Sequence, residues 1–530
     1  MHPEVVKGRG GAAPATAGDS AHRLETDALG SITLPARVYY GIHTARAVAN
    51  FPISGVLLKD HPAFIVALAM VKQAAAQANQ QLGLLDGRRA SAIVEACDDV
   101  RAGRLDTSFV VDMIQGGAGT STNMNINEVI ANRALEILGL PRGTYEHLHP
   151  LSHVNLSQST NDCYPTAIKV ALQLQLSDLI RTLESAASAF RTKATEFAHL
   201  VKMGRTQLQD AVPMTLGQEF GAYAVMVGED AQRLREAATL ITEVNLGGTA
   251  IGTGLNAPAG YPELVCRRLS EISGLKLSVA VDLVEATQDV GAFVQISGVL
   301  KRTAVKLSKI CSDLRLLSSG PRAGLNEINL PAVQAGSSIM PGKVNPVIPE
   351  VVNQVAFQVI GNDVTVTMAA EAGQLQLNAF EPIIADTLFR SIRHLDAACR
   401  VLVSRCIEGI TANPVHLRDS VMNSIGVVTA LTPVIGYAAA AQIAQVAMAS
   451  GRPVAELATE LGGCRQTKWR ACCGPRLLSC TQPTIPRKED HDRFDRCARP
   501  ARGTGDLYPA AGVLRHPGLQ RTRQCANSRH

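Results

Sequence analysis

Four polar segments of the chain combine hydroxyl, amide and cationic side chains in a mixture suited to binding carboxylates. They occupy residues 116–125, 157–162, 204–210 and 336–346, and the last contains Lys343. Hydroxyl and amide groups donate hydrogen bonds to a carboxylate, and a lysine adds a compact positive charge. The four segments are therefore the first candidates for a site that binds an acidic small molecule.

We expect at least the first three segments to end where a helix begins. The N-terminus of a helix presents unpaired N–H groups and a partial positive charge, so it favours anions. Capping alone explains any single run of Ser, Thr and Asn. Capping does not require Gly119, Lys343 and Asn345 as well. Several such helix ends meeting in one place would make a site for a dicarboxylate.

The 336–346 segment also carries a resemblance to a known family. It reads Gly-Ser-Ser-Ile-Met-Pro-Gly-Lys-Val-Asn-Pro, which closely resembles the Gly-Ser-Ser-x-Met-Pro-x-Lys-x-Asn signature of the fumarase/aspartase superfamily. The resemblance runs from about Arg23 to about Leu461. Within the superfamily, residues 201–213, 325–331 and 347–354 resemble the aspartase branch. Gln207 stands where fumarases carry a histidine.

The resemblance implies a reaction and a base. The reaction is removal of a Cβ proton from L-aspartate through an aci-carboxylate, with release of ammonia and fumarate. Ser337 would be the base, as an alkoxide. A serine hydroxyl is too weak an acid for this role unless local N–H groups, with help from Lys343, stabilise the anion. The resemblance also implies a set of substrate-binding residues: Thr120, Ser121, Ser159, Thr160, Asn161, Thr206, Gln207, Ser338 and Asn345.

The position of Gln207 is informative about the substrate. A charged imidazole there would repel the ammonium group of an amino acid, whereas a neutral amide accepts a hydrogen bond from it. This favours aspartate. Fumarate hydratase or another lyase of the superfamily stays open as an alternative activity.

The elements that must position these residues are predominantly helical. Apolar residues recur at helical spacing after Pro62, after Thr122, after Pro165 and from Thr215, where Thr215-x-x-Gln218 forms a capping box. The clearest stripe alternates by four and three, as in a long bundle helix, and consists of Phe293, Ser297, Leu300, Ala304, Leu307, Cys311 and Leu314. Residues 349–368 and 382–410 add two more helices, and residues 23–50 are expected to hold a small hairpin.

We therefore predict an all-α protein with a central bundle of five long helices. The resemblance implies three domains and a homotetramer with a twenty-helix core, in which three subunits share each active site. The predicted regions are a disordered extension at 1–22, an N-terminal domain at 23–158, the bundle at 159–412, a small helical domain at 413–461 and a separate tail at 462–530.

Composition limits the class of protein. Hydrophobic residues make up 46% of the chain and aromatic residues only 4%, which favours packed helices. Residues 421–450 carry no charge, but polar residues and Pro433 interrupt them, so buried helices are expected rather than a membrane span. No signal peptide is recognisable, and six cysteines are scattered before residue 461, as in a reduced cytoplasmic protein.

The tail from residue 462 has a different composition. It holds six of the twelve cysteines and a net charge of +9, which leaves −4 on the remainder of a chain whose total is +5. A basic appendage that binds metal or nucleic acid is one interpretation. Against this interpretation, the cysteines form no C-x-x-C pair. A frameshifted or misassembled end is favoured, because the tail is rich in residues that an out-of-frame, GC-rich message would encode. Such an end would shorten the small domain, so an inactive remnant is a further alternative.

No cofactor, nucleic acid or membrane partner is predicted. The glycines at 247–254 match a turn of the family rather than a phosphate-binding loop. Some aspartases respond to a divalent metal, but no dedicated metal site stands out in this sequence. The expected ligands are L-aspartate and fumarate alone.

Overall fold

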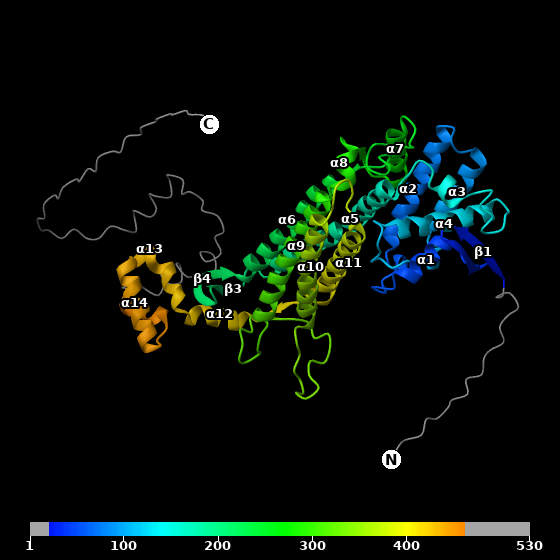
Figure 1. Cartoon of the computed structure of the whole chain (residues 1–530). Helices are drawn as coiled ribbons and strands as arrows, with labels where there is room; N and C mark the ends of the chain where they lie inside the picture. The colour runs from blue at the N-terminus through cyan, green and yellow to red at the C-terminus, as the bar shows by residue number, and fades with distance from the viewer. Residues whose placement is uncertain (1–20, 462–530) are drawn as a thin grey trace, which may run out of the picture. The chain divides into compact units, whose positions relative to one another are not determined.

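The computed structural model describes residues 21–461, and within them helices predominate (Figure 1). The predicted 1–22 extension lies almost wholly outside the described residues, and the 462–530 tail lies entirely outside them. The helices are α1 (Ile42–Asn50), α2 (Pro62–Gln81), α3 (Gly87–Arg101), α4 (Thr120–Ile137), α5 (Thr160–Glu196), α6 (Leu216–Ala238), α7 (Tyr261–Ser273), α8 (Leu283–Gln288), α9 (Gly291–Leu317), α10 (Val347–Glu371), α11 (Glu381–Arg405), α12 (Pro414–Asn423), α13 (Thr432–Ile435), α14 (Tyr437–Ser450) and α15 (Val454–Glu460).

Short strands pair two by two between these helices. Three pairs are antiparallel and the pair β5–β6 is parallel. The strands are β1 (His22–Asp27) with β2 (Gly30–Pro35), β3 (Val201–Thr206) with β4 (Gln209–Thr215), β5 (Glu243–Val244) with β6 (Ser278–Val279), and β7 (Ile328–Asn329) with β8 (Thr411–Ala412). The hairpin predicted within residues 23–50 is confirmed as β1–β2.

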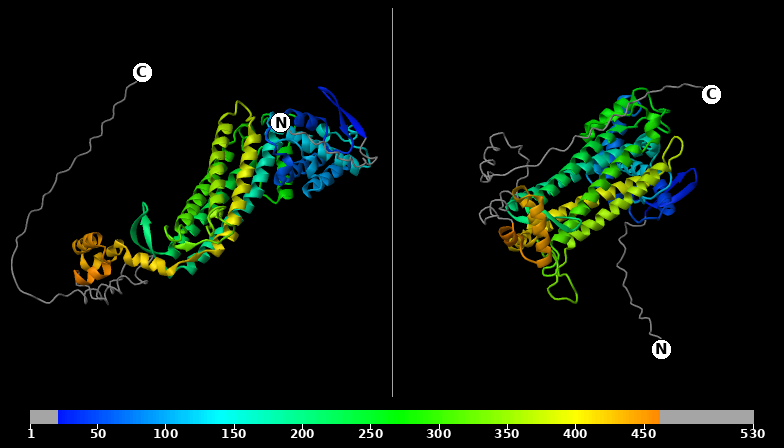
Figure 2. Two further views of the ribbon diagram at one scale, coloured as in Figure 1. Left: turned by 90° about the horizontal axis from the view of Figure 1, so that it is seen from below. Right: turned by 90° about the vertical axis from the view of Figure 1, so that its left-hand side faces the viewer.

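The five long helices α5, α6, α9, α10 and α11 form the predicted bundle. Each packs against the next in the order α5, α6, α9, α10, α11, and α11 returns to α5 (Figure 2). All seven residues of the stripe that begins at Phe293 are buried on α9. Because successive residues of the stripe are four or three positions apart, they lie on one face of the helix, and this face packs into the bundle core. The prediction of an all-α fold around a five-helix bundle is confirmed.

Helix α5 begins earlier than predicted. Ser159 caps it, and Pro165 lies inside the helix rather than before it. A proline in a helix cannot donate to the carbonyl four residues earlier, here that of Asn161. The side-chain amide of Asn245 donates to that carbonyl instead, at 2.9 Å. This substitute hydrogen bond lets the helix extend back to Thr160, among the predicted substrate-binding residues.

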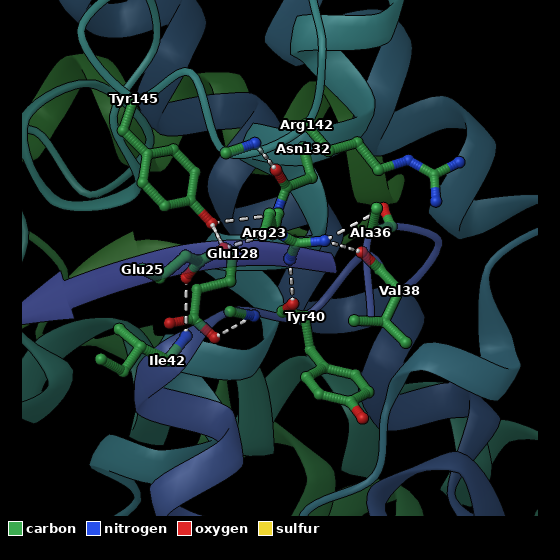
Figure 3. Close-up of polar contacts among 12 residues, drawn as sticks. Arg23, Glu25, Ala36, Val38, Tyr40, Ile42, Glu128, Asn132, Arg142 and Tyr145 are labelled. Carbon is green, nitrogen blue, oxygen red and sulfur yellow. Dashed lines mark hydrogen bonds and ion pairs between the residues drawn. The ribbon is translucent and has the colours of Figure 1, made fainter. Parts of the chain in front are cut away.

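Two carboxylates hold the start of α1, Glu25 from the hairpin and Glu128 from α4 (Figure 3). Glu128 accepts from the backbone N–H of Gly41 at 2.7 Å and from the Thr44 hydroxyl at 2.6 Å, and Glu25 accepts from the N–H of Ile42 at 2.8 Å. Arg23 pairs with Glu25 at 2.7 Å. Burial raises the pKa of Glu128, although the N–H groups oppose the shift. The first unpaired N–H groups of α1 are thus satisfied internally.

Residues 204–210 form a hairpin turn, so the expectation that a helix begins at the end of this segment was wrong. Strands β3 and β4 pair across Gln207 and Leu208, whose φ values are 53° and 65°. The next helix starts only at Leu216, after Thr215 and Gln218 close the predicted capping box. Residues 201–215 therefore form paired strands, and the helix begins only after the cap at Thr215.

The C-terminal part of the described chain has its own small core. Residues of α12, α14 and α15 bury Val421, Ile443 and Leu457 in a hydrophobic cluster separate from the main one, and Met203 of β3 joins them. The uncharged run at 421–450 is divided among several short helices. Within residues 21–461, no helix is long and apolar enough to cross a membrane.

Candidate active site

The 336–346 loop supports Ser337 with backbone donors. The Ser337 Oγ accepts from the N–H of Met340 at 2.8 Å and from the N–H of Ile339 at 3.2 Å. Hydrogen bonds to the charged form of a group favour that form. The loop therefore has the backbone donors that a serine anion needs, and Ser337 is only half-buried, within reach of a ligand.

The same loop is closed on itself by two of the predicted residues. The N–H of Gly336 donates to the carbonyl of Lys343 at 3.0 Å, and the side-chain amide of Asn345 donates to the carbonyl of Gly336 at 2.6 Å. A Cβ atom at position 336 would lie 2.2 Å from the Lys343 carbonyl, so only glycine fits. Lys343 and Ser338 are exposed on this loop.

The 157–162 and 116–125 segments meet at the N-termini of α5 and α4. Asn123 donates from Nδ2 to the Thr160 hydroxyl at 3.0 Å, which joins the two segments directly. The Ser159 hydroxyl accepts from the N–H of Asn161 at 3.2 Å. Thr120 begins α4 and its hydroxyl donates to the Gly117 carbonyl at 2.7 Å. Two of the predicted anion-binding helix ends therefore lie together.

A small pocket adjoins these helix ends. Its volume is about 140 Å³, and Thr120 and Ser121 line it together with Arg46 and His43 of α1. Arg46 pairs with Asp27 at 2.8 Å, which holds the guanidinium in place. The pocket places the Ser121 hydroxyl beside a cation, a combination that suits a carboxylate, while the Thr120 hydroxyl donates to Gly117.

A buried carboxylate anchors the start of α5. Asp162 accepts from the N–H groups of Ser159 at 2.9 Å and of Gly247 and Thr249 at 3.0 Å. Burial raises the pKa of Asp162 to about 6, and the three N–H groups act in the opposite direction. Asn161 adds a hydrogen bond to the Ala250 carbonyl at 2.8 Å. The glycine-rich turn thus uses its N–H groups on the protein's own carboxylate, as expected of a structural turn.

The hairpin β3–β4 carries Thr206 and Gln207, both exposed. Beside them lies a pocket of about 310 Å³, which Lys309 and Asp313 of α9 also line. Arg205 on the hairpin pairs with the buried Glu327 at 2.6 Å. Glu327 lies just before β7, on the chain that leads to the 336–346 loop, so this ion pair ties the third and fourth segments to one end of the bundle.

Within one chain the four segments divide into two groups. The 157–162 segment precedes α5 and the 204–210 segment follows it, so the 37 residues of α5 separate them by roughly 55 Å. Figure 1 shows the hairpin and the loop before α10 at one end of the bundle, and α4 at the other. The residues predicted to share a site therefore come together only if different chains contribute them.

Sequence reasoning missed one buried cation at this site. Lys72 of α2 is fully buried and donates to Asn123 at 2.7 Å, to Asn155 at 2.9 Å and to Gln158 at 2.9 Å. Lys72 follows Leu68 by four residues, so it lies on the buried face of a strongly apolar helix. A lone lysine on such a face was the available signal. Among residues 21–461, no group of three His, Cys, Asp or Glu side chains is arranged to hold a metal ion.

Family models match most of the described chain. A model described as lyase matches residues 30–361, and a model described as fumarase C C-terminus matches residues 427–478. The second match extends past Leu461, so the family resemblance reaches further along the chain than the motifs indicated.

Curated relatives and solved structures show the same likeness. Proteins named aspartate ammonia-lyase are 62% identical over 441 residues in Pseudomonas fluorescens and 54% identical over 441 residues in Escherichia coli, in each case covering 83% of this chain and 92% of the relative. The crystal structure titled fumarate lyase:delta crystallin from Brucella melitensis bound to cobalt has a TM-score of 0.84 at 57% identity, over 86% of this chain and 100% of that one. A class II fumarase from Schistosoma mansoni has a TM-score of 0.82 at 36% identity, over 86% and 98%.

Proposed function

This chain belongs to the fumarase/aspartase superfamily of lyases, and from that premise we propose that it releases ammonia from L-aspartate to form fumarate. Relatives at 54–62% identity carry the name aspartate ammonia-lyase, whereas the fumarase match is at 36%. The observation that carries the chemistry is the pair of backbone N–H groups directed at Ser337 Oγ. They supply what a serine needs to act as a base.

The reaction begins at the carbon next to the β-carboxylate. The Ser337 alkoxide takes the proton from Cβ, and the electron pair of the broken C–H bond spreads onto the adjacent carboxylate as an aci-anion. That pair then forms the carbon–carbon double bond while the C–N bond breaks, and its electrons leave with ammonia. Fixed donors that face the doubly charged carboxylate lower the barrier, because they act most strongly when that charge develops.

The remaining predicted residues hold the substrate. Lys343 and Asn345 bind a carboxylate near the base, and hydroxyl and amide groups bind the other carboxylate and the amino group. Gln207 accepts a hydrogen bond from the ammonium. The hydroxyl and amide set is Thr120, Ser121, Ser159, Thr160, Asn161, Thr206 and Ser338.

We further propose that the active unit is a homotetramer with sites shared among three subunits. The separation of the four segments along α5 supports this, since one chain holds them at opposite bundle ends. An exposed apolar stripe on α10 supplies a contact surface: Phe357, Val364 and Met368 are 62%, 58% and 67% exposed. Their spacing of seven and four places them on one face of the helix, ready to pack on another bundle.

The deciding experiment compares two substrates. The purified full chain is incubated with L-aspartate or with L-malate, and fumarate is followed by its ultraviolet absorbance. The proposal expects fumarate and one equivalent of ammonia from aspartate, and little or none from malate. Fumarate from malate alone would assign the chain to the hydratases, and absence of product from both would indicate an inactive remnant.

A further inference from the structure

The buried ammonium of Lys72 is surrounded by amide oxygens. Its Nζ lies 2.7 Å from Asn123 Oδ1, 2.9 Å from Asn155 Oδ1 and 2.9 Å from Gln158 Oε1. Nζ also lies 3.7 Å from Cys163 Sγ, a weak acceptor. An ammonium has three N–H bonds and no acceptor, so the three amide oxygens are its closest and strongest partners. The cation therefore dictates that each of the three amides turns its oxygen, not its nitrogen, inward.

This orientation passes from Asn123 to a predicted substrate-binding residue. Because Asn123 Oδ1 faces Lys72, its Nδ2 is left to donate, and it donates to Thr160 Oγ1 at 3.0 Å and to Asn155 Oδ1 at 3.1 Å. The thiol of Cys163 also points its Sγ at Asn123 Oδ1, at 3.2 Å, which adds a second donor on the same side. Burial raises the pKa of Cys163 to about 11, so this thiol keeps its proton.

A threonine hydroxyl that accepts from Asn123 keeps its own proton for another partner. A carboxylate is an acceptor only, so it needs such a proton. The reverse orientation, with an acceptor at the Asn123 Nδ2 position, would draw the Thr160 proton inward. The direction of one buried hydrogen bond therefore decides whether Thr160 donates toward a ligand.

We propose that Lys72 is a positioning residue that acts through Asn123 to direct the Thr160 O–H bond toward a substrate carboxylate. The inference rests on the proposed ammonia-lyase function and adds to it a determinant of carboxylate binding that lies beneath the site. A lysine with only a structural role would stabilise α2 and α5 without any effect that depends on the Thr160 hydroxyl.

The sharpest test is Asn123→Asp. A carboxylate at this position still accepts from Lys72, so the buried cation gains a counter-ion, but the donation to Asn155 Oδ1 is lost. These two effects oppose each other, and we expect the variant to stay folded with a small change in melting temperature. The new Oδ2 cannot donate to Thr160 and instead accepts its proton. We expect the KM for L-aspartate to rise about tenfold to a hundredfold, with a smaller change in kcat, because a hydrogen bond to a charged group is lost.

The decisive readout is a double-mutant cycle with Thr160→Val. Once the hydroxyl is gone, Asn123→Asp should add little to the KM already raised by Thr160→Val. Lys72→Met should behave in the same way. It should raise KM clearly in an enzyme that has Thr160 and raise it less in the Thr160→Val enzyme. If Lys72→Met does not fold, Asn123→Asp still completes the test.

Lys169→Met is the matched control. Lys169 is also buried on a bundle helix, but it donates to the Glu243 carbonyl, at 2.8 Å, and lies outside the chain of hydrogen bonds to Thr160. It should lower the melting temperature and leave KM unchanged. Additive effects of Asn123→Asp and Thr160→Val in an enzyme that is active on aspartate would overturn the inference alone. A wild-type chain without ammonia release would overturn the proposed function, and with it the inference.

Discussion

Ser337 is distinguished from the neighbouring serine by its hydrogen-bond partners. Ser337 Oγ receives two backbone N–H groups, whereas Ser338 is exposed on the same loop. Two donors aimed at one oxygen stabilise its anion before a substrate binds, so no reorganisation is needed at the moment of proton transfer. In the proposed mechanism, the chemistry of the loop therefore depends on one of two adjacent, chemically identical side chains.

Replacing Ser337 should separate binding from catalysis. Ser337→Ala removes the base, and we expect kcat for ammonia release to fall by a factor of about 10²–10⁴ or more, while the affinity for the unreactive dicarboxylate succinate changes little. Steady-state kinetics and calorimetry provide the two measurements. Ser338→Ala serves as the matched loop variant with a much smaller effect. A Ser337→Ala enzyme of nearly normal kcat would exclude the proposed base.

At the residue scale, the sequence identified groups that form a recognisable pattern. Ser337, Lys343 and Asn345 stand in a long contiguous signature, and the structure shows hydrogen bonds within that same loop. Lys72 and Asn123 act through contacts 51 residues apart in the chain. Spacing could not predict which amide a buried lysine would meet, because that depends on how α2 packs against α4 and α5.

At the scale of elements, the bundle contains an acid that burial holds in its neutral form. Glu381 begins α11 and is 3% exposed. Burial raises its pKa to about 8, and Lys169 opposes the shift only in part. The glutamic acid therefore keeps its proton at neutral pH, and its ionisation within the core is unfavourable.

This predicts a stability that declines as the pH rises. The pKa of Glu381 is about 8 in the folded protein, against an ordinary value of 4.5. Between these two pH values the folded state binds one proton that the unfolded state has lost, so raising the pH favours the unfolded state. Above about pH 7, where most of Asp162 has titrated, the free energy of unfolding should fall with a slope that approaches roughly 1.4 kcal/mol per pH unit and levels off above about pH 8. Urea unfolding at fixed chain concentration measures the slope.

Glu381→Gln should flatten that dependence, since an amide has the same shape and does not titrate. Glu371→Gln, at the exposed end of α10, is the matched control and should leave the slope as in the wild type. Equal slopes for wild type and Glu381→Gln would show that this carboxyl is not the group responsible.

Sequence patterns predicted long helices well and the β3–β4 hairpin poorly. A helix of 27 residues such as α9 repeats its apolar face many times, so the period is unmistakable. The turn of the hairpin has Gln207 and Leu208 at positive φ, where Asn and Gly are the usual residues. Without Asn or Gly at these positions, the local sequence does not indicate a hairpin turn, and the pairing of β3 with β4 stabilises it.

At the scale of the whole molecule, shared sites predict complementation between inactive chains. One variant is Ser337→Ala, and the other carries Ser159→Ala with Thr160→Val. When equal amounts are dissociated mildly and reassembled together, about one quarter of the sites should combine an intact loop with an intact α5 end. Ammonia release from the mixture is compared with that of each variant taken through the same steps alone.

The mixture distinguishes two arrangements. If one chain supplied all four segments to its own site, every site in the mixture would keep a defect and the activity would not recover. The distance along α5 favours recovery. The sequence could identify the four segments, but their division between the two bundle ends depends on where each helix starts and stops. Residue spacing within one chain also cannot indicate which chain completes a site.

The length of α5 also has a consequence for inheritance. If sites are shared as proposed, a chain with a damaged 336–346 loop places that loop in a site whose α4 and α5 residues belong to its neighbours, so it disables a site that an intact chain helped to build. In a cell that makes normal and defective copies together, a lesion at one end of α5 would disable a fraction of sites equal to the fraction of defective chains. A chain damaged at both ends would disable more, because it contributes to two sites, whereas lesions at opposite ends of two different chains would leave some sites intact. The outcome of combining two alleles would then depend on which end of the same helix each one damages.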